Sequence, residues 1–239
     1  MSLNKNKVAL VTGATKGMGK AISFALVKEG YTLIACARKQ DTLEQLQNDI
    51  KNVFPDANVL IQACDFSKPA QVEDLLQWVD KGSLQVNVLV NNVGLFIPGY
   101  LLKEPADMLA KHIQVNVFTP HLLSVHFGRK MRENQSGHIF MITSVASRSA
   151  VVTAGSYSVT KYALAGLTAV LRKELKDDHV KVTEIIPGST LTSSWEGTTI
   201  PEEEFVQAED IAQALISALN MSAGANVDEI IIKPVKGNL

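Results

Sequence analysis

The chain alternates short apolar runs with stretches in which apolar residues recur at helical spacing. The runs at residues 8–11 and 86–90 have few polar interruptions, which is typical of strands covered on both faces. Between such runs, Leu43, Leu46 and Ile50 follow the spacing of one helix face. Repeated strand–helix alternation predicts βαβ units with right-handed crossovers, and therefore an α/β fold with a doubly wound (Rossmann) parallel sheet flanked by helices on both faces.

This pattern predicts strands at residues 8–11, 31–36, 58–63, 86–90, 138–143, 181–186 and 229–232. It predicts helices from about residue 17 to 29, and at about 41–53, 69–78, 107–132, 157–176 and 209–219. No shift in composition and no linker divides the chain, so residues 1–239 are expected to form a single domain.

One segment interrupts the alternation. Residues 189–204 are rich in Ser, Thr and Gly, and carry Leu191 and Trp195 among the polar positions. A loop of this length in a compact domain is usually functional or disordered. We expect a lid over a partly apolar substrate, with a mobile surface loop as the alternative.

Composition excludes several classes of protein. The net charge of −1 gives no electrostatic footprint for nucleic acid, and no apolar run approaches the length of a membrane span. The polar residues 1–7 show no secretory signal. Cys36 and Cys64 lack C-x-x-C spacing, so buried free thiols in a cytoplasmic protein are expected, and the five histidines show no spacing that predicts a metal site.

A glycine-rich turn lies between the first predicted strand and the first predicted helix. Its spacing is G-x-x-x-G-x-G rather than G-x-G-x-x-G. Glycines at this place permit a tight turn and let a pyrophosphate approach the backbone, while the helix N-terminus offers free N–H groups. The candidate cofactor-binding residues of this turn are Gly13, Thr15, Lys16, Gly17, Met18 and Gly19.

The end of the second predicted strand indicates which dinucleotide is bound. An acidic residue there accepts a hydrogen bond from a ribose 2′-hydroxyl, whereas cations suit a 2′-phosphate. The strand is followed by Arg38 and Lys39 without Asp or Glu, and Lys16 of the glycine turn is a third cation. This pattern favours NADP(H) over NAD(H), with ordinary solvated charges as the alternative.

Tyr157 and Lys161 lie four positions apart on a predicted helix, which places the phenol and the ammonium on one face. A neighbouring cation is expected to lower the pKa of the phenol toward neutrality, where it can exchange a proton. The alternative is an ordinary surface pair on an amphipathic helix. Asn116 and Ser144 accompany the pair and favour the catalytic interpretation.

These motifs together resemble the short-chain dehydrogenase/reductase family over essentially the whole chain. The family's T-G-x-x-x-G-x-G motif matches residues 12–19, and its N-N-A-G motif matches residues 91–94, with Val93 in place of alanine. Its P-G turn matches Pro187 and Gly188. The resemblance implies a catalytic set formed by Asn116, Ser144, Tyr157 and Lys161.

The resemblance also implies further contacts. Asp65, with Phe66 beside it, is expected near the adenine, and Thr192 near the nicotinamide carboxamide. Ser144, Tyr157 and Trp195 are expected at the substrate, while residues 149–151 and the lid select it. The remaining cofactor contacts implied by the resemblance are Asn92, Gly94, Tyr157, Lys161, Pro187 and Gly188.

The implied reaction is carbonyl reduction, with hydride from NADPH and a proton from Tyr157. The substrate is either a small ketone or related carbonyl, or a 3-oxoacyl group on an acyl-carrier protein. A catalytically silent NADP-binding regulator is the alternative of a different class. The resemblance further implies a homo-oligomer, a dimer or tetramer, without nucleic acid, membrane or metal.

Overall fold

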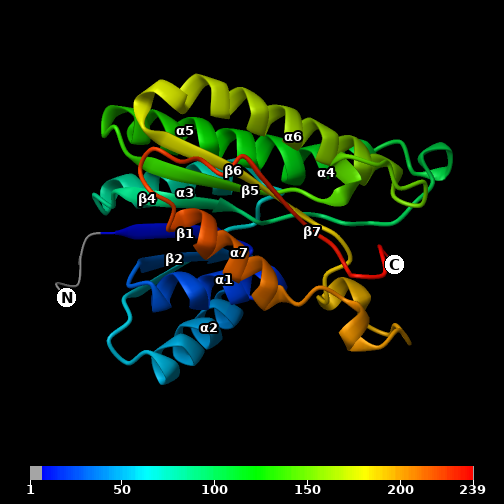
Figure 1. Ribbon diagram of the computed structural model, residues 1–239, viewed down its shortest axis with the longest axis horizontal. Coiled ribbons are helices and arrows are strands. Elements are labelled where there is room, and N and C mark those ends of the chain that lie inside the picture. The colour runs from blue at the N-terminus through cyan, green and yellow to red at the C-terminus, as the bar shows by residue number, and fades with distance from the viewer. Residues whose placement is uncertain (1–6, 239) are drawn as a thin grey trace.

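A computed structural model describes residues 7–238 and contains a seven-stranded sheet in the order β3-β2-β1-β4-β5-β6-β7 (Figure 1). Every neighbouring pair of strands runs parallel. This order is that of a doubly wound dinucleotide-binding sheet, which confirms the predicted fold class. The strands are β1 Val8–Thr12, β2 Thr32–Ala37, β3 Val59–Ala63, β4 Val86–Asn91, β5 Gly137–Ile142, β6 Val180–Pro187 and β7 Glu229–Ile232.

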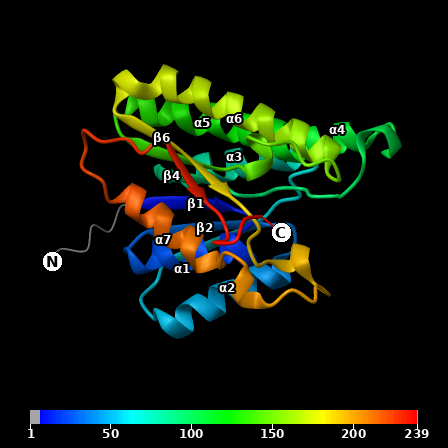
Figure 2. The ribbon, with the colours of Figure 1, turned by 45° about the vertical axis from the view of Figure 1, so that its right-hand side comes forward.

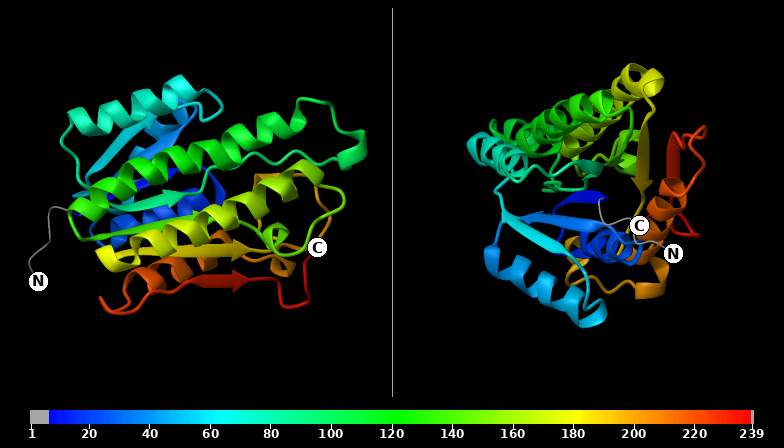
Figure 3. Two further views of the ribbon diagram at one scale, coloured as in Figure 1. Left: turned by 90° about the horizontal axis from the view of Figure 1, so that it is seen from above. Right: turned by 90° about the vertical axis from the view of Figure 1, so that its left-hand side faces the viewer.

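Helices cover both faces of the sheet and enclose two apolar cores. One core lies under α1 (Gly17–Lys28), α2 (Gln40–Val53) and α7 (Ala208–Leu219). The other lies under α3, α5 and α6, which run side by side when seen from above (Figure 3). Their bounds are Pro69–Lys81, Thr119–Glu133 and Gly155–Leu175.

The long helical stretch predicted at about 107–132 is present, but it is not one regular α-helix. The segment consists of α4 (Met108–Ile113), a π-helical turn (Gln114–Phe118) and α5. Pro120 has no N–H to donate to the carbonyl of Asn116, and the N–H of Thr119 bonds instead to the carbonyl of Gln114, five residues back. The π-helical turn therefore contains Asn116, one of the predicted catalytic residues.

The segments that follow the strands gather at one end of the sheet, on the right in Figure 1 and Figure 2. Residues 189–204 belong to this group and include two 3-10 turns, Ser193–Trp195 and Glu202–Glu204. A bridge between Thr190 and Val206 closes the segment at its base. Ligands in such sheets bind at the carboxyl ends of the strands, so this end is where the site is sought.

The described residues bear on the expectations for the cysteines, for membrane-spanning helices and for metal sites. Cys36 and Cys64 are buried free thiols, as predicted. Within residues 7–238, no helix has the length and apolarity to span a membrane, and no cluster of side chains suits a metal ion. The polar segment before Lys7 and the last residue, 239, lie outside the described residues.

Candidate active site

The glycine turn has a backbone that other residues would distort. Gly13 and Gly17 lie in the left-handed region, with φ of 66° and 48°. A Cβ on Gly19 would lie 2.1 Å from the carbonyl oxygen of Gly13, too close for any side chain. The turn therefore brings bare backbone to the surface at the start of α1.

The N-terminus of α1 is free to receive an anion. Its N-cap, Lys16, is extended and makes no side-chain capping bond, so the first N–H groups of the helix lack a side-chain partner. Uncapped N–H groups and the positive end of the helix dipole suit a pyrophosphate. The donor chemistry of the turn thus fits the dinucleotide predicted from its sequence.

Thr12 and Asn92 brace this turn against β4. The amide of Asn92 donates to the carbonyls of Thr12 and Gly13 at 2.9 and 3.2 Å. The hydroxyl of Thr12 accepts from the N–H groups of Asn92 and Val93, each at 3.0 Å, and donates to the carbonyl of Val90 at 3.2 Å. The side chain of Asn92 therefore holds the loop in shape, which makes its predicted part in cofactor binding an indirect one.

The residues predicted for the adenosine end lie after β2 and β3. Arg38, Lys39 and Lys16 are exposed. Asp65 accepts from the N–H and the hydroxyl of Ser67 at 3.0 and 2.7 Å. Burial raises the pKa of the Asp65 carboxyl, but the Ser67 bonds and the charges of Lys68 and Arg38 outweigh it and lower the pKa.

Phe66 has few groups available for a contact with the cofactor. Its ring is buried in the core beneath α3 and α5. Its carbonyl accepts from the hydroxyl of Thr119 at 2.9 Å. Any contact of Phe66 with a cofactor would therefore come from its N–H.

The inner face of α6 carries the predicted catalytic pair. Lys161 is only 4% exposed, and its ammonium donates to the carbonyl of Ile142 at 3.1 Å. The same nitrogen lies 5.4 Å from the centre of the Tyr157 ring. The ammonium thus lies against the face of the ring and the end of β5.

The expectation that Lys161 lowers the pKa of Tyr157 was wrong for this structure. Burial raises the pKa of the phenol above its ordinary value, and a hydrogen bond with Ser144 offsets only part of that rise. Burial also lowers the pKa of Lys161 to about 8, against the attraction of Glu184, which raises it. Desolvation dominates because Lys161 is buried between α6 and the end of β5, while Tyr157 is surrounded by Phe96, His112 and Ser144. The phenol consequently stays protonated at neutral pH.

Ser144 follows β5 and reaches the same point. Its hydroxyl oxygen accepts from the N–H of Ala146 at 3.1 Å and caps a 3-10 turn, Val145–Ser147. It also acts on the Tyr157 phenol, whose pKa it lowers. The hydroxyl of Ser144 is thereby held beside the proton that Tyr157 carries.

Asn116 joins this group from the π-helical turn. Its side-chain oxygen accepts from the N–H of Leu95 at 2.7 Å, and its amide donates to the carbonyl of Leu95 at 2.9 Å and to Thr160 at 3.0 Å. A Cβ built on Gly94 would lie 3.8 Å from both the Asn116 oxygen and the Lys161 nitrogen. The two groups therefore border one space, which the missing side chain of Gly94 leaves open.

This space adjoins the glycine turn. Asn92 bonds Gly13, and Gly94, which borders Lys161, comes two residues later. Two residues span at most about 7 Å. The structure thus brings the predicted catalytic and cofactor residues to one end of the sheet, as their order along the chain suggested.

The segment at 189–204 approaches the glycine turn at Thr192. The methyl group of Thr192 lies 3.0 Å from where a Cβ of Gly17 would be. Trp195 packs edge-on against Phe205, with ring centres 4.9 Å apart. After Pro187, Gly188 bonds the carbonyl of Ile232 at 2.7 Å. Thr192 therefore lies at the mouth of the turn, and Trp195 lies further along the same segment.

Three neighbours of the site were not singled out from the sequence. The ring of Phe96 meets that of Tyr157 edge-on at 4.9 Å, and the buried ring of His112 lies 6.5 Å from it. Glu184 lies in β6 and acts on Lys161. A detectable signal existed for Glu184 alone, since an acidic residue in the middle of an apolar strand is unusual.

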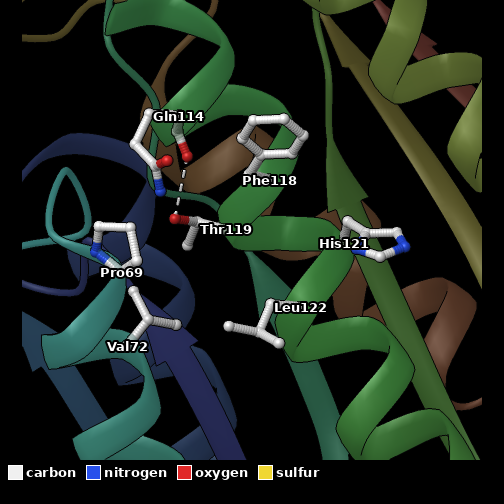
Figure 4. A pocket seen from close by; sticks show the side chains of 7 residues that line it. All are labelled: Pro69, Val72, Gln114, Phe118, Thr119, His121 and Leu122. Carbon is white, nitrogen blue, oxygen red and sulfur yellow. Dashed lines mark hydrogen bonds between the residues drawn. The ribbon is translucent and has the colours of Figure 1, made fainter.

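Two hollows lie apart from this group. A cavity of about 620 Å³ is bordered by Leu102, Val152 and Tyr162, on the face of α6 turned away from Tyr157. A smaller pocket of about 250 Å³ lies between α3 and the start of α5, where the hydroxyl of Thr119 bonds the carbonyl of Gln114 (Figure 4). Neither is lined by the predicted catalytic residues, but Ala150 and Val151 of the predicted selector segment line the larger one.

Comparison with known proteins agrees with this geometry. Residues 7–202 match the family model described as short chain dehydrogenase. An uncharacterised oxidoreductase of Staphylococcus epidermidis is 30% identical over 236 residues, covering 98% of this chain and 100% of the relative. Dehydrogenase/reductase SDR family member 11 of Gallus gallus is 30% identical over 246 residues, covering 96% of each chain. The chain belongs to the short-chain dehydrogenase/reductase family of oxidoreductases.

Solved structures show the same likeness. A metagenomic short-chain oxidoreductase in complex with NADP is 26% identical, with a TM-score of 0.84, over 98% of this chain and 99% of that one. An alcohol dehydrogenase from Thermococcus sibiricus, complexed with 5-hydroxy-NADP, is 27% identical, with a TM-score of 0.88, over 98% of each chain.

Proposed function

We propose that this protein reduces the carbonyl group of a small molecule to an alcohol at the expense of NADPH. The observation that carries the proposal is the convergence of the Tyr157 phenol, the Ser144 hydroxyl and the Lys161 ammonium beside the glycine turn. When bound, NADPH supplies the hydride. The similar structures complexed with NADP or 5-hydroxy-NADP support this choice of cofactor.

The glycine turn and the cations around it would hold the cofactor. The uncapped start of α1 suits the pyrophosphate, and Arg38, Lys39 and Lys16 suit a 2′-phosphate. The absence of an acidic residue directly after β2 removes the usual partner of a ribose 2′-hydroxyl. On this chemistry we propose NADP(H) rather than NAD(H).

Tyr157 is the proposed proton donor to the carbonyl oxygen. Its raised pKa keeps the phenol protonated at neutral pH, which suits reduction, whereas alcohol oxidation would need the phenolate and hence a higher pH. Ser144 would donate to the same oxygen and stabilise the charge that develops there. Lys161 would place an ammonium beside the phenolate left behind, and Asn116 would border the path by which a proton returns from solvent.

Two of the basic residues that would attract an acidic carrier protein are paired with carboxylates of this chain. Lys130 pairs with Asp80 at 2.6 Å. Arg132 pairs with Asp178 at 2.7 Å. Such pairs reduce the free positive charge at the ends of α5 and α6, so we favour a small carbonyl substrate over an acyl-carrier-protein thioester. Trp195 and residues 149–151 are the proposed selectors of that substrate.

We further propose a homo-oligomer in the cytoplasm, built from residues 1–239 as one domain. Apolar side chains exposed on α6 and at the end of the π-helical turn support contact between copies, namely Val159, Tyr162, Val170 and Phe118. The buried free thiols of Cys36 and Cys64 support a reducing compartment.

The test is Tyr157→Phe, followed by NADPH oxidation at 340 nm (the absorbance of the reduced cofactor) with a panel of ketones and aldehydes. We expect turnover to be abolished while NADPH binding persists, because the ring remains and the transferable proton is lost. Tyr162→Phe is the matched control, since that ring is exposed on the opposite face of α6. Unchanged turnover in the Tyr157 variant, or no turnover by the unmodified protein on any carbonyl, would refute the proposal.

A further inference from the structure

Glu184 is a carboxylate in an apolar position. It lies in the middle of β6, and its side chain follows Val180 and Val182 on the strand face that packs against α6. Glu184 is only 2% exposed. Burying a carboxylate is costly unless charged or hydrogen-bonding groups surround it. Its partners therefore decide what it does.

Both carboxylate oxygens of Glu184 are engaged. The hydroxyl of Thr143 donates to one oxygen at 2.7 Å. The guanidinium of Arg148 donates to the other at 2.9 Å, and the same nitrogen donates to Glu229 on β7 at 2.8 Å. Thr143 follows β5 directly, and Arg148 follows the 3-10 turn after Ser144. Glu184 thus ties both ends of the segment that carries Ser144.

That segment also holds Lys161. The carbonyl of Ile142, which accepts from the ammonium, precedes Thr143, and Ser144 follows it. Lys161 is buried, the Tyr157 ring on α6 lies 5.4 Å from its nitrogen, and the carboxylate of Glu184 on β6 attracts it. The negative charge of Glu184 therefore offsets part of the cost of burying the ammonium.

We propose that Glu184 is a positioning residue of the catalytic centre, which holds the segment from Ile142 to Ser144 through Thr143 and supplies the buried negative charge that faces Lys161. The proposal rests on the proposed function for its catalytic meaning. Its electrostatic part stands on two buried charges bonded to adjacent residues of one segment, Lys161 to the carbonyl of Ile142 and Glu184 to the hydroxyl of Thr143.

The charge is tested with Glu184→Gln, which keeps an oxygen that accepts from Thr143 and removes the negative charge. We expect the pKa of Lys161 to fall by roughly one unit from its value of about 8. Lys161 is followed directly through the 13Cε resonance of labelled lysine, assigned with Lys161→Arg. The alkaline limb of the pH profile of kcat/KM for carbonyl reduction, where activity falls at high pH, should move about one pH unit lower.

Two variants separate charge from structure. Glu184→Asp retains the negative charge, so Lys161 is expected to titrate near its original pH even if turnover falls. Glu229→Gln removes a charge from the outer end of the same Arg148, and it should leave the titration of Lys161 in place. Thr143→Val removes the hydroxyl donor and is expected to lower kcat without moving the alkaline limb.

Unchanged titration of Lys161 in folded Glu184→Gln, or an equal shift in Glu229→Gln, would overturn the electrostatic part. Unchanged kcat in Thr143→Val would overturn the positioning part. The resonance titration needs no turnover, so it remains decisive if no carbonyl is reduced, and that second failure would count against the proposed function instead. Should Glu184→Gln not fold, Glu184→Asp and Arg148→Gln carry the test, since Arg148→Gln leaves Glu184 less compensated and is expected to raise the pKa of Lys161.

Discussion

Replacing Lys161 with Met is expected to abolish turnover and yet stabilise the protein at neutral pH. The ammonium of Lys161 is charged at pH 7 in both the folded and the unfolded chain, but only the folded chain buries it. Methionine keeps a linear apolar side chain in the same space and removes the charge. The variant therefore loses the catalytic ammonium, and it no longer has the free-energy cost of burying that charge.

The magnitude follows from the fall in the pKa of Lys161 from 10.5 to about 8. That fall corresponds to roughly 3 kcal/mol of unfolding free energy at pH 7. The lost hydrogen bond to the carbonyl of Ile142 costs roughly 1–3 kcal/mol in the opposite direction. We expect a net gain of about 1 kcal/mol, or roughly 2–4 °C in Tm for a chain of this length.

The pH dependence gives the sharper test. Between pH 8 and 10.5 the unfolded state of the unmodified protein binds more protons at Lys161 than the folded state does, so its stability rises with pH across this window. Lys161→Met lacks this rise, and its advantage should shrink by roughly 3 kcal/mol and reverse. Urea unfolding of both proteins at several pH values measures the difference, in which other titrating groups cancel.

If the difference in unfolding free energy between the unmodified protein and Lys161→Met stays constant from pH 7 to 10.5, the reasoning is refuted, because Lys161 is then not desolvated on folding. A variant less stable than the original at pH 7, with the same slope as the original, would do so as well. Lys173→Met, on the last turn of the same helix, is the control for loss of a cation without burial.

Three further outcomes are expected. Ser144→Ala should lower kcat roughly 100-fold with unchanged NADPH affinity by fluorescence titration, and a defect confined to affinity would contradict its role. Arg38→Ala should weaken NADPH binding roughly tenfold and NADH binding little, whereas equal losses would argue against a 2′-phosphate contact. Gly19→Ala should abolish cofactor binding, because its Cβ would meet the carbonyl of Gly13 at 2.1 Å. Gly166→Ala, inside α6 with open space around it, is the control and should retain binding without a fall in Tm.

Much of the fold was predictable from local patterns. Apolar strands and helical spacing predict the alternation, and the right-handed crossover then constrains the topology. The interruption at Gln114–Phe118 escaped this reasoning because the apolar spacing continues through it. Pro120 was the available signal, since its missing N–H removes the bond that a continuous helix would make to Asn116.

The sequence by itself determined which chemical groups follow which strands: the glycine turn after the first, Ser144 after the fifth, and Tyr157 with Lys161 one helical turn apart. Only the tertiary structure decided their electrostatic state. Burial raises the pKa of Tyr157 and lowers that of Lys161, and for the phenol this is the opposite of what an exposed pair at this spacing would show. Spacing along a helix sets which groups are neighbours, whereas their desolvation depends on strands and helices that are distant in the chain. Glu184 on β6, which bonds Thr143 after β5, is the clearest instance of such a distant group.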